Sequence, residues 1–283
     1  MIASLPEGET LACPPNKTSE PSVIGIDIGS RSIELVELSS AGISRQVKLP
    51  TTFDPMGQCR KLTDGLNGSR IIATGYGRKL FAESFPQANV SAITEIQAYA
   101  LGAAFLYPDA ATVLDIGGQD TKVISLSKNG KVLKFEMNDR CAAGTGKFLE
   151  FMATALQIPL ETFGDFALRS DRRIGISSMC TVFAESEATS LMARGESPEN
   201  IAMGLHMAIV QRTAAMLKRV GISPPLVFAG GVAHNPCVVR LLEEELALPV
   251  VVPENPDMVG ALGAALYGRN MAGAPGSHIG GFH

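Results

Sequence analysis

Two short segments place an aspartate at the end of an apolar run and a glycine-containing turn directly after it. Residues 27–32 read DIGSRS and residues 115–120 read DIGGQD, so the Asp, Ile and Gly of both coincide. Backbone N–H groups of such turns bind phosphate oxygens, and a neighbouring carboxylate can hold hydrated Mg²⁺. A single copy is also explained by hairpin geometry, but two copies favour a nucleotide site. We predict catalytic roles for Asp27 and Asp115 as holders of Mg²⁺, and phosphate binding by Gly29, Ser30, Arg31, Ser32, Gly117, Gly118 and Gln119.

Two cysteines lie in segments of similar character, MNDRCAAGTGKF around Cys141 and SSMCTVFAESEA around Cys180. Each follows a polar stretch and precedes an expected helix, whose dipole favours a thiolate suited to metal binding. Two thiolates do not complete an iron–sulfur cluster or a tetrahedral zinc site, which usually take four ligands. A two-fold dimer brings four together, so we predict one bridging 4Fe–4S cluster per homodimer, with zinc as the competing metal.

The segment DRCAAGTGKF also has the Gly-Lys pair of a Walker A loop. However, Cys141 stands where that loop needs its first glycine, and Phe148 stands where it needs a hydroxyl. We therefore assign the phosphates to the turns at Gly29 and Gly117. We expect Gly144 and Thr145 to face the nucleotide, with Thr145 capping the following helix, while Cys141 faces the dimer axis.

A third glycine-rich element, FAGGVAHN at residues 228–235, ends an apolar run before an expected helix. Glycines there let a flat ring approach the backbone, although a tight strand-to-helix turn is the simpler explanation. We predict contacts to adenosine from this turn and from the small-residue helix near the C-terminus, through Gly230, Gly231, Ala233, His234 and Gly263.

Strand and helix patterns alternate, which predicts an α/β protein. Residues 23–28 and 33–38 form one expected hairpin and residues 112–116 and 121–126 another, an internal repeat that indicates two similar domains. Helices are expected at residues 94–106, 147–157, 183–194, 198–219 and 259–268. We place the domains at residues 22–95 plus 258–270 and 96–257, between a disordered tail (1–21) and a C-terminal tail (271–283).

The composition narrows the functional class. The chain has 283 residues, 46% of them hydrophobic, and a net charge of −4. Without clustered Lys and Arg it lacks the electrostatic footprint of nucleic-acid binding. No apolar run is long enough to span a membrane, and no secretory signal pattern is present. Five cysteines without tight spacing are not a secreted disulfide framework, so we expect a cytoplasmic protein.

The order of these motifs resembles the actin/Hsp70/sugar-kinase ATPase superfamily. That resemblance implies two ribonuclease-H-like domains with ATP in the cleft between them. The segments DIGGQDTKVI, MNDRCAAGTGKFLE, SSMCTVFAESE and GGVAHN further resemble activator components of 2-hydroxyacyl-CoA dehydratases, in the BadF/BadG/BcrA/BcrD ATPase family.

This closer resemblance implies an oxygen-sensitive homodimer with one 4Fe–4S cluster, ligated by Cys141 and Cys180 of both subunits. It implies that ATP hydrolysis delivers a low-potential electron to the partner dehydratase, and that ferredoxin or flavodoxin re-reduces the activator. Three alternatives remain open: an ATP-binding subunit of a benzoyl-CoA reductase-type enzyme, a sugar or acid kinase, and a zinc-bridged assembly protein.

Some features depart from the family pattern or fall outside it. Glu34 stands where the family commonly has a lysine. The segment TGYGR at residues 74–78 predicts a turn of unassigned role. Cys59 is expected in an irregular polar stretch, Cys237 in the packing of a helix that could lower its pKa, and Cys13 in the tail.

Overall fold

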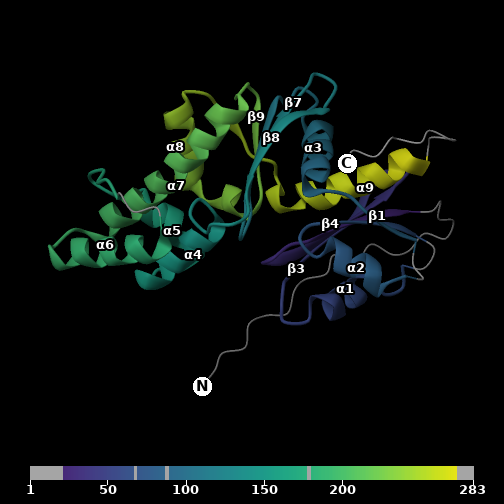
Figure 1. Ribbon diagram of the computed structural model, residues 1–283, viewed down its shortest axis with the longest axis horizontal. Coiled ribbons are helices and arrows are strands. Elements are labelled where there is room, and N and C mark those ends of the chain that lie inside the picture. The colour runs from purple at the N-terminus through teal and green to yellow at the C-terminus, as the bar shows by residue number, and fades with distance from the viewer. Residues whose placement is uncertain (1–21, 67–68, 87–88, 177–179, 273–283) are drawn as a thin grey trace.

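The computed structural model describes residues 22–66, 69–86, 89–176 and 180–272, which form two five-stranded mixed sheets with helices around and between them (Figure 1). The expected disordered tail, Cys13 and almost all of the expected C-terminal tail lie outside these ranges. The first sheet has the order β3-β2-β1-β4-β5. Its strands are β1 (Val23–Ile28), β2 (Ser32–Ser39), β3 (Gly42–Pro50), β4 (Arg70–Thr74) and β5 (Val90–Ala92).

The second sheet repeats the first, with the order β8-β7-β6-β9-β10. In each sheet the central strand pairs antiparallel with the next strand and parallel with the one after the crossover. The predicted internal repeat is therefore confirmed. The strands are β6 (Thr112–Ile116), β7 (Thr121–Leu126), β8 (Val132–Asn138), β9 (Leu226–Ala229) and β10 (Val250–Val251).

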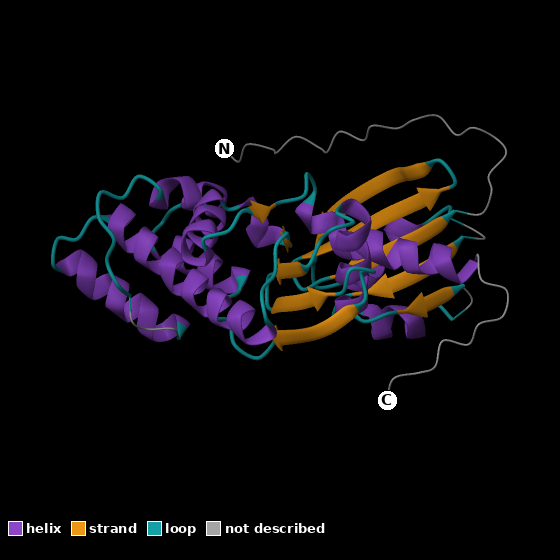
Figure 2. Cartoon of the chain, turned by 90° about the horizontal axis from the view of Figure 1, so that it is seen from above, coloured by secondary structure: helices purple, strands orange, loops and turns teal. Residues whose placement is uncertain are grey.

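The two halves differ in the connection from their third strand to their fourth. Residues 51–69 join β3 to β4, and the part of this link that the structure describes contains one short helix, α1 (Pro55–Thr63). The corresponding link from β8 to β9 spans residues 139–225 and carries both Cys141 and Cys180. Its helices form the lobe at one end of the molecule (Figure 2): α4 (Gly146–Ala155), α5 (Leu160–Ala167), α6 (Thr181–Ala193) and α7 (Pro198–Val220).

Helices α3 (Glu95–Leu106) and α9 (Val259–Ala272) pack against each other between the two sheets (Figure 1). Their close approach depends on small residues. A Cβ on Gly263 would lie 1.7 Å from the carbonyl oxygen of Ala98, and one on Gly102 would lie 2.1 Å from that of Val259. Helix α9 continues to Ala272, beyond the expected end at residue 268.

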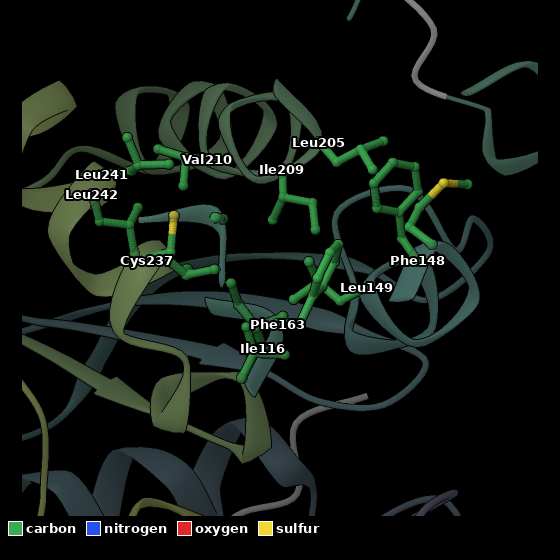
Figure 3. Close-up of a cluster of buried hydrophobic side chains, with 14 of the residues drawn as sticks. Ile116, Phe148, Leu149, Phe163, Leu205, Ile209, Val210, Cys237, Leu241 and Leu242 are labelled. Carbon is green, nitrogen blue, oxygen red and sulfur yellow. The ribbon is translucent and has the colours of Figure 1, made fainter. Parts of the chain in front are cut away.

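The outer faces of the sheets are covered by the remaining helices. On the first sheet, α1 and α2 (Arg78–Ser84) bury Phe81 and Cys59 against the isoleucines of β1. Cys59 is thus a fully buried helical residue, and the expected irregular stretch is wrong. On the second sheet, α4, α5, α7 and α8 (Pro236–Leu246) build the largest apolar cluster (Figure 3), including Ile116, Phe148, Phe163, Ile209 and Leu242.

Local signals explain where several helices begin. The side chains of Thr94, Ser197 and Asn235 accept hydrogen bonds from backbone N–H groups at the starts of α3, α7 and α8. Pro198 and Pro236 occupy the first helical positions, where a missing N–H costs nothing. Thr145 precedes α4 as expected, but its hydroxyl donates to the carbonyl of Ala142 at 2.7 Å and does not cap the helix.

Candidate functional site

The two predicted phosphate turns occupy equivalent places in the two halves. Asp27 near the end of β1 and Asp115 near the end of β6 are 5% and 0% exposed. In the turns that follow, the N–H of Gly29 donates to the carbonyl of Ser32 at 3.0 Å, and the N–H of Gly117 donates to that of Asp120 at 2.9 Å. The structure therefore gives both turns one construction.

A further glycine lies behind each aspartate. Gly75 follows β4 with φ +85°, and a Cβ there would lie 2.4 Å from Oδ1 of Asp27. Gly230 follows β9 with φ +84°, and a Cβ there would lie 2.3 Å from Oδ1 of Asp115. The TGYGR turn, of unassigned role in the sequence, is therefore the first half's counterpart of the Gly230-Gly231 turn.

The residues paired with the two aspartates carry opposite charges. Glu34 of β2 lies directly opposite Asp27, and Lys122 of β7 lies directly opposite Asp115. Burial raises the pKa of Asp27 well above its usual range, with the Glu34 charge as a further cause. Burial likewise raises the pKa of Glu34 to about 7. The first half thus buries a carboxylate pair where the second half has an ion pair.

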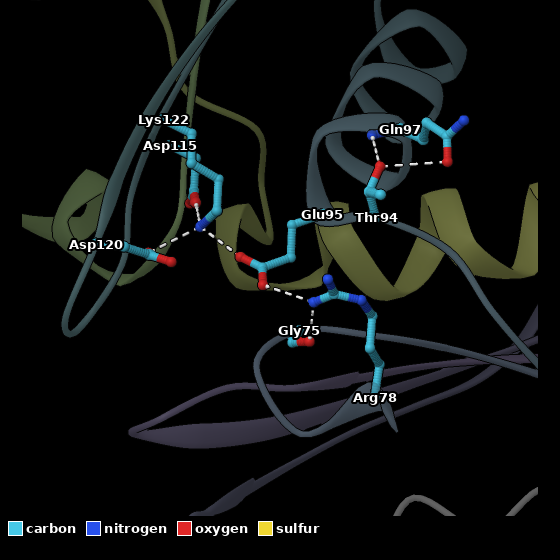
Figure 4. Close-up of polar contacts among 8 residues, drawn as sticks. All are labelled: Gly75, Arg78, Thr94, Glu95, Gln97, Asp115, Asp120 and Lys122. Carbon is cyan, nitrogen blue, oxygen red and sulfur yellow. Dashed lines mark hydrogen bonds and ion pairs between the residues drawn. The ribbon is translucent and has the colours of Figure 1, made fainter. Parts of the chain in front are cut away.

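Lys122 is the centre of a buried polar cluster (Figure 4). Its Nζ lies 2.8 Å from Oδ2 of Asp115, 2.7 Å from Oδ1 of Asp120 and 2.8 Å from Oε2 of Glu95. Burial by itself would lower the pKa of Lys122, but these carboxylates outweigh it and raise the pKa well above its usual range. Burial raises the pKa of Asp115 to about 6 against the pull of Lys122, so both groups are charged at pH 7.

The segment 139–148 joins the second phosphate turn to Cys141. The N–H groups of Gly146 and Lys147, at the start of α4, donate to the carbonyls of Gly117 and Gly118 at 2.9 and 2.8 Å. Because these carbonyls take the first free N–H groups of α4, the helix begins directly on the turn.

The rest of that segment is held from the second sheet. The hydroxyl of Thr121 donates to the carbonyl of Gly144 at 2.6 Å. The side chain of Asn138 donates to the carbonyls of Cys141 and Ala143 at 2.9 and 3.1 Å. A short, continuously bonded path therefore connects the turn at Gly117 with the Cys141 loop.

The glycine-rich turn 228–235 lies close to the same place. A Cβ on Gly146 would lie 3.2 Å from Cγ2 of Val232, so this turn and the start of α4 are in contact. Ala233 is 4% exposed, so little of its surface is accessible to a ligand. The exposed His234 has its Nε2 2.7 Å from Oδ2 of Asp257, an oxygen that also pairs with Lys48 at 2.9 Å.

Arg31 bridges the two halves. A Cβ on Gly118 would lie 2.1 Å from Cγ of Arg31, so the arginine lies across the second phosphate turn. Its Nη2 pairs with Oε1 of Glu150 in α4 at 2.7 Å. Ser30, Ser32 and Gln119 complete the two turns, and Gln119 is exposed. Gly263 instead packs against Ala98, so we attribute this glycine to helix packing.

Both predicted metal-ligating cysteines are exposed, free thiols. Cys180 directly precedes α6, as expected for a thiolate favoured by a helix dipole. Cys141 is separated from the start of α4 by Ala142–Thr145, so the expected helix end lies further away there. Cys237 is buried in the core, where burial raises its pKa to about 12.

The described ranges offer two kinds of potential metal ligand, thiolates and carboxylates. Within the described ranges, no three His, Cys, Asp or Glu side chains are arranged to hold a metal ion. The four-thiolate cluster expected from the sequence is therefore not held by the described residues of one chain alone. Asp115 has a buried Oδ1 without a hydrogen-bond partner, and Asp27 and Glu34 bury two acids together. An oxygen-preferring cation such as hydrated Mg²⁺ fits this donor set.

The sequence analysis assigned no role to five side chains of the site: Lys122, Glu95, Arg78, Asp257 and Glu150. Lys122 could have been predicted from the sequence, because counting along the two strands on either side of the DIGGQD turn places it opposite Asp115. The other four act through contacts between elements far apart in the chain.

No helix in the described part of the chain is both long and apolar enough to cross a membrane.

Known proteins share this architecture along almost the whole chain. An activator of lactoyl-CoA dehydratase from Anaerotignum propionicum is 39% identical over 263 residues, which cover 88% of this chain and 98% of that protein. The crystal structure of component A of the Acidaminococcus fermentans (R)-2-hydroxyglutaryl-CoA dehydratase is 36% identical and superimposes with a TM-score of 0.82, covering 90% of this chain and 100% of that one.

A third relative carries a nucleotide analogue. The activator of the 2-hydroxyisocaproyl-CoA dehydratase from Clostridium difficile, with bound ADPNP, is 34% identical with a TM-score of 0.79, covering 91% of this chain and 100% of that one. The two repeated sheets confirm the predicted fold, an α/β ATPase of the actin/Hsp70/sugar-kinase type. The profile of the BadF/BadG/BcrA/BcrD ATPases matches residues 24–268, and the chain therefore belongs to the BadF/BadG/BcrA/BcrD ATPase family.

Proposed function

We propose that the protein is an ATP-hydrolysing electron donor that activates a 2-hydroxyacyl-CoA dehydratase. The observation that carries this proposal is the bonded path from the Gly117 turn through α4 to the Cys141 loop. A sugar or acid kinase would need the turns but has no use for an exposed cysteine loop bonded to one of them. A benzoyl-CoA reductase-type subunit would use the same parts in a stable larger complex, whereas the three relatives described above belong to dehydratase systems.

The residues have distinct roles in this proposal. Backbone N–H groups of the turns at Gly29 and Gly117 bind phosphate oxygens, and Arg31 supplies a cation for them. Asp27 and Asp115 orient hydrated Mg²⁺. The Gly230-Gly231 turn, with Ala233 and His234, lines the adenosine side. Lys122 holds the Asp115 carboxylate in place.

Cys141 and Cys180 of two subunits supply the four thiolates of one 4Fe–4S cluster in the homodimer. When bound, the cluster supplies a one-electron carrier of low potential. Val182 and Phe183, next to Cys180, are 63% and 66% exposed, and such apolar side chains suit a subunit interface. The partners of the dimer are the dehydratase and, as electron donor, ferredoxin or flavodoxin.

Anaerobic purification followed by electron paramagnetic resonance of the reduced protein, with and without Mg·ADPNP, tests the proposal. We expect a homodimer with a cluster signal that changes on nucleotide binding. Cys141→Ala and Cys180→Ala should lose the signal, while Cys237→Ala should keep it. Asp115→Asn should keep the cluster and lose at least about 100-fold in ATP hydrolysis rate. An iron-free dimer with full ATPase activity would refute the cluster.

A further inference from the structure

We propose that Glu95 is a positioning residue for the nucleotide site and that it joins Lys122 to Arg78 of the turn behind Asp27. The inference rests on the proposed role of Asp27 and Asp115 and extends it. It assigns a function to the TGYGR turn and to a carboxylate outside both phosphate motifs.

The first part of the link is Lys122. Its ammonium has three N–H donors, and each has one carboxylate within 2.8 Å: Asp115, Asp120 and Glu95. Its side chain is 3% exposed, so water does not substitute for a lost partner. An ammonium in this position competes with a divalent cation for Asp115. Glu95 shares the ammonium charge and so weakens its hold on Asp115.

The second part is Glu95 itself. It is the first residue of α3, directly after the capping residue Thr94, where a negative charge is favoured by the helix dipole. Helix α3 packs between the two sheets, so its first turn faces both halves of the molecule (Figure 1). One carboxylate oxygen of Glu95 meets Lys122, and the other lies 3.5 Å from Nη1 of Arg78 (Figure 4).

The third part is the turn that carries Arg78. The same Nη1 donates to the carbonyl of Gly75 at 2.8 Å, which fixes the guanidinium on the turn. The N–H of Gly77 donates to the carbonyl of Ile28 at 3.0 Å, so the turn is bonded to the strand end that carries Asp27. A chain of polar contacts therefore runs from Asp115, through Lys122, Glu95 and Arg78, to the support of Asp27.

This chain ties the two aspartates together across the halves. We expect that breaking it at Glu95 leaves Lys122 more firmly on Asp115 and removes the contact from α3 that restrains Arg78 and, through it, the Gly75 turn behind Asp27. Both effects weaken Mg²⁺ binding. The property that reports the link is therefore the Mg²⁺ concentration needed for nucleotide binding, and not stability alone.

The test compares four single-substitution variants of the full-length chain, purified anaerobically. Calorimetry with ADPNP at increasing Mg²⁺ gives the Mg²⁺ concentration at half-maximal binding, and ATPase assays give the same midpoint for hydrolysis. Glu95→Gln should raise both midpoints roughly tenfold, since a partner of a buried ion cluster is lost. Glu95→Asp keeps the charge but shortens the side chain, and it should raise them about threefold or more.

Arg78→Gln separates position from charge, because it leaves the Lys122 cluster intact. If charge alone mattered, removing this cation would favour Mg²⁺ binding and lower the Mg²⁺ midpoint. The link to the turn instead predicts a modest rise in that midpoint. The matched control is Glu136→Gln, which breaks the surface pair between Glu136 and Arg219 and should leave the midpoint unchanged.

These measurements test both the positioning role of Glu95 and its link to the turn. Unchanged midpoints in Glu95→Gln, a lowered melting temperature with normal Mg²⁺ dependence, or a normal Glu95→Asp would overturn the positioning role. An unchanged or lowered midpoint in Arg78→Gln would overturn the link to the turn. If the wild-type protein itself neither bound nor hydrolysed ATP, the proposed function would fail first, and that outcome is separate from the others.

Discussion

Glu34 lies directly opposite Asp27 in the β1–β2 ladder, and each residue is only 5% exposed. The equivalent pair in the second half is Lys122 and Asp115. Two neighbouring buried carboxyl groups repel each other when both are ionised, and this repulsion destabilises the first half. The second half has no such repulsion at the equivalent pair.

This pair predicts a pH-dependent gain in stability for Glu34→Gln in the absence of nucleotide and metal. The pKa of Glu34 is raised to about 7 in the folded protein. The contribution of this carboxyl group to the free energy of unfolding is therefore fully present at acidic pH and is lost as pH rises through 7. The variant should match the wild type near pH 5 and exceed its free energy of unfolding by about 2 kcal/mol at pH 8. Urea unfolding at both pH values checks this, with Glu37→Gln of the same strand as the control. An equal effect at both pH values would contradict it.

Gly75 should be intolerant of a side chain for two reasons. Its φ is +85°, and a Cβ would lie 2.4 Å from Oδ1 of Asp27. Gly195 has a similar φ of +83° with no atom within 4 Å of its Cβ position. Gly195→Ala should therefore lower the free energy of unfolding by about 1 kcal/mol, through the backbone conformation alone. Gly75→Ala should lower it by about 3 kcal/mol or more. Thermal unfolding measures both. Equal losses would show that the carboxylate contact does not matter.

The pair of Arg31 with Glu150 should restrain the arginine before nucleotide binds. Both side chains are partly exposed, 50% and 26%, so the pair adds little to stability. Glu150→Gln should tighten ADPNP binding about threefold, because Arg31 becomes free to meet phosphate, while Arg31→Gln should weaken it about tenfold. Calorimetry gives both constants. Lys147→Gln, which removes the other partner of Glu150, is the control and should not tighten binding.

His206 in α7 should limit stability in acid. The tautomer follows from its partners: Nδ1 donates to the carbonyl of Ala202 at 2.7 Å, and Nε2 accepts from the side chain of Asn235 at 3.0 Å. Burial lowers the pKa of His206 to about 4. The neutral ring is therefore stable above pH 6.5, and stability is lost as pH falls from there toward 4.

The measurement is the difference in unfolding free energy between wild type and His206→Asn. The variant should be the less stable protein at pH 7, and the difference should shrink by about 2 kcal/mol by pH 4.5. A constant difference for His206→Asn would mean that the ring does not take up a proton in this range.

The sequence predicted the repeated hairpins because the two DIG turns and their β-branched flanks recur in one order. It predicted the starts of α7 and α8 because Ser197-Pro198 and Asn235-Pro236 are strong local signals. It missed α1, although Asp54 and Pro55 form a similar start, because only Cys59 and Leu62 of that helix are buried. Strands β3 and β8 were missed as well, since their mostly exposed faces leave no apolar run.

The candidate site was predicted where its residues are close in sequence. Asp27, Asp115 and the turn glycines follow from short motifs. Glu95, Arg78 and Asp257 do not, because their partners come from other elements and only the packing of α3 and α9 between the sheets brings them together. Gly263 illustrates a related point: a small-residue helix suits a close ligand or a close helix, and in the structure this glycine packs against Ala98.

The long connection from β8 to β9 has a historical consequence. The shared strand order of the two halves is the pattern expected from duplication of a gene segment. In the second half, residues 139–225 occupy the place that residues 51–69 occupy in the first. Both exposed cysteines lie in that added stretch. The electron-transfer chemistry proposed above would then be a later acquisition, added to an older nucleotide-binding fold and bonded to it at the Gly117 turn.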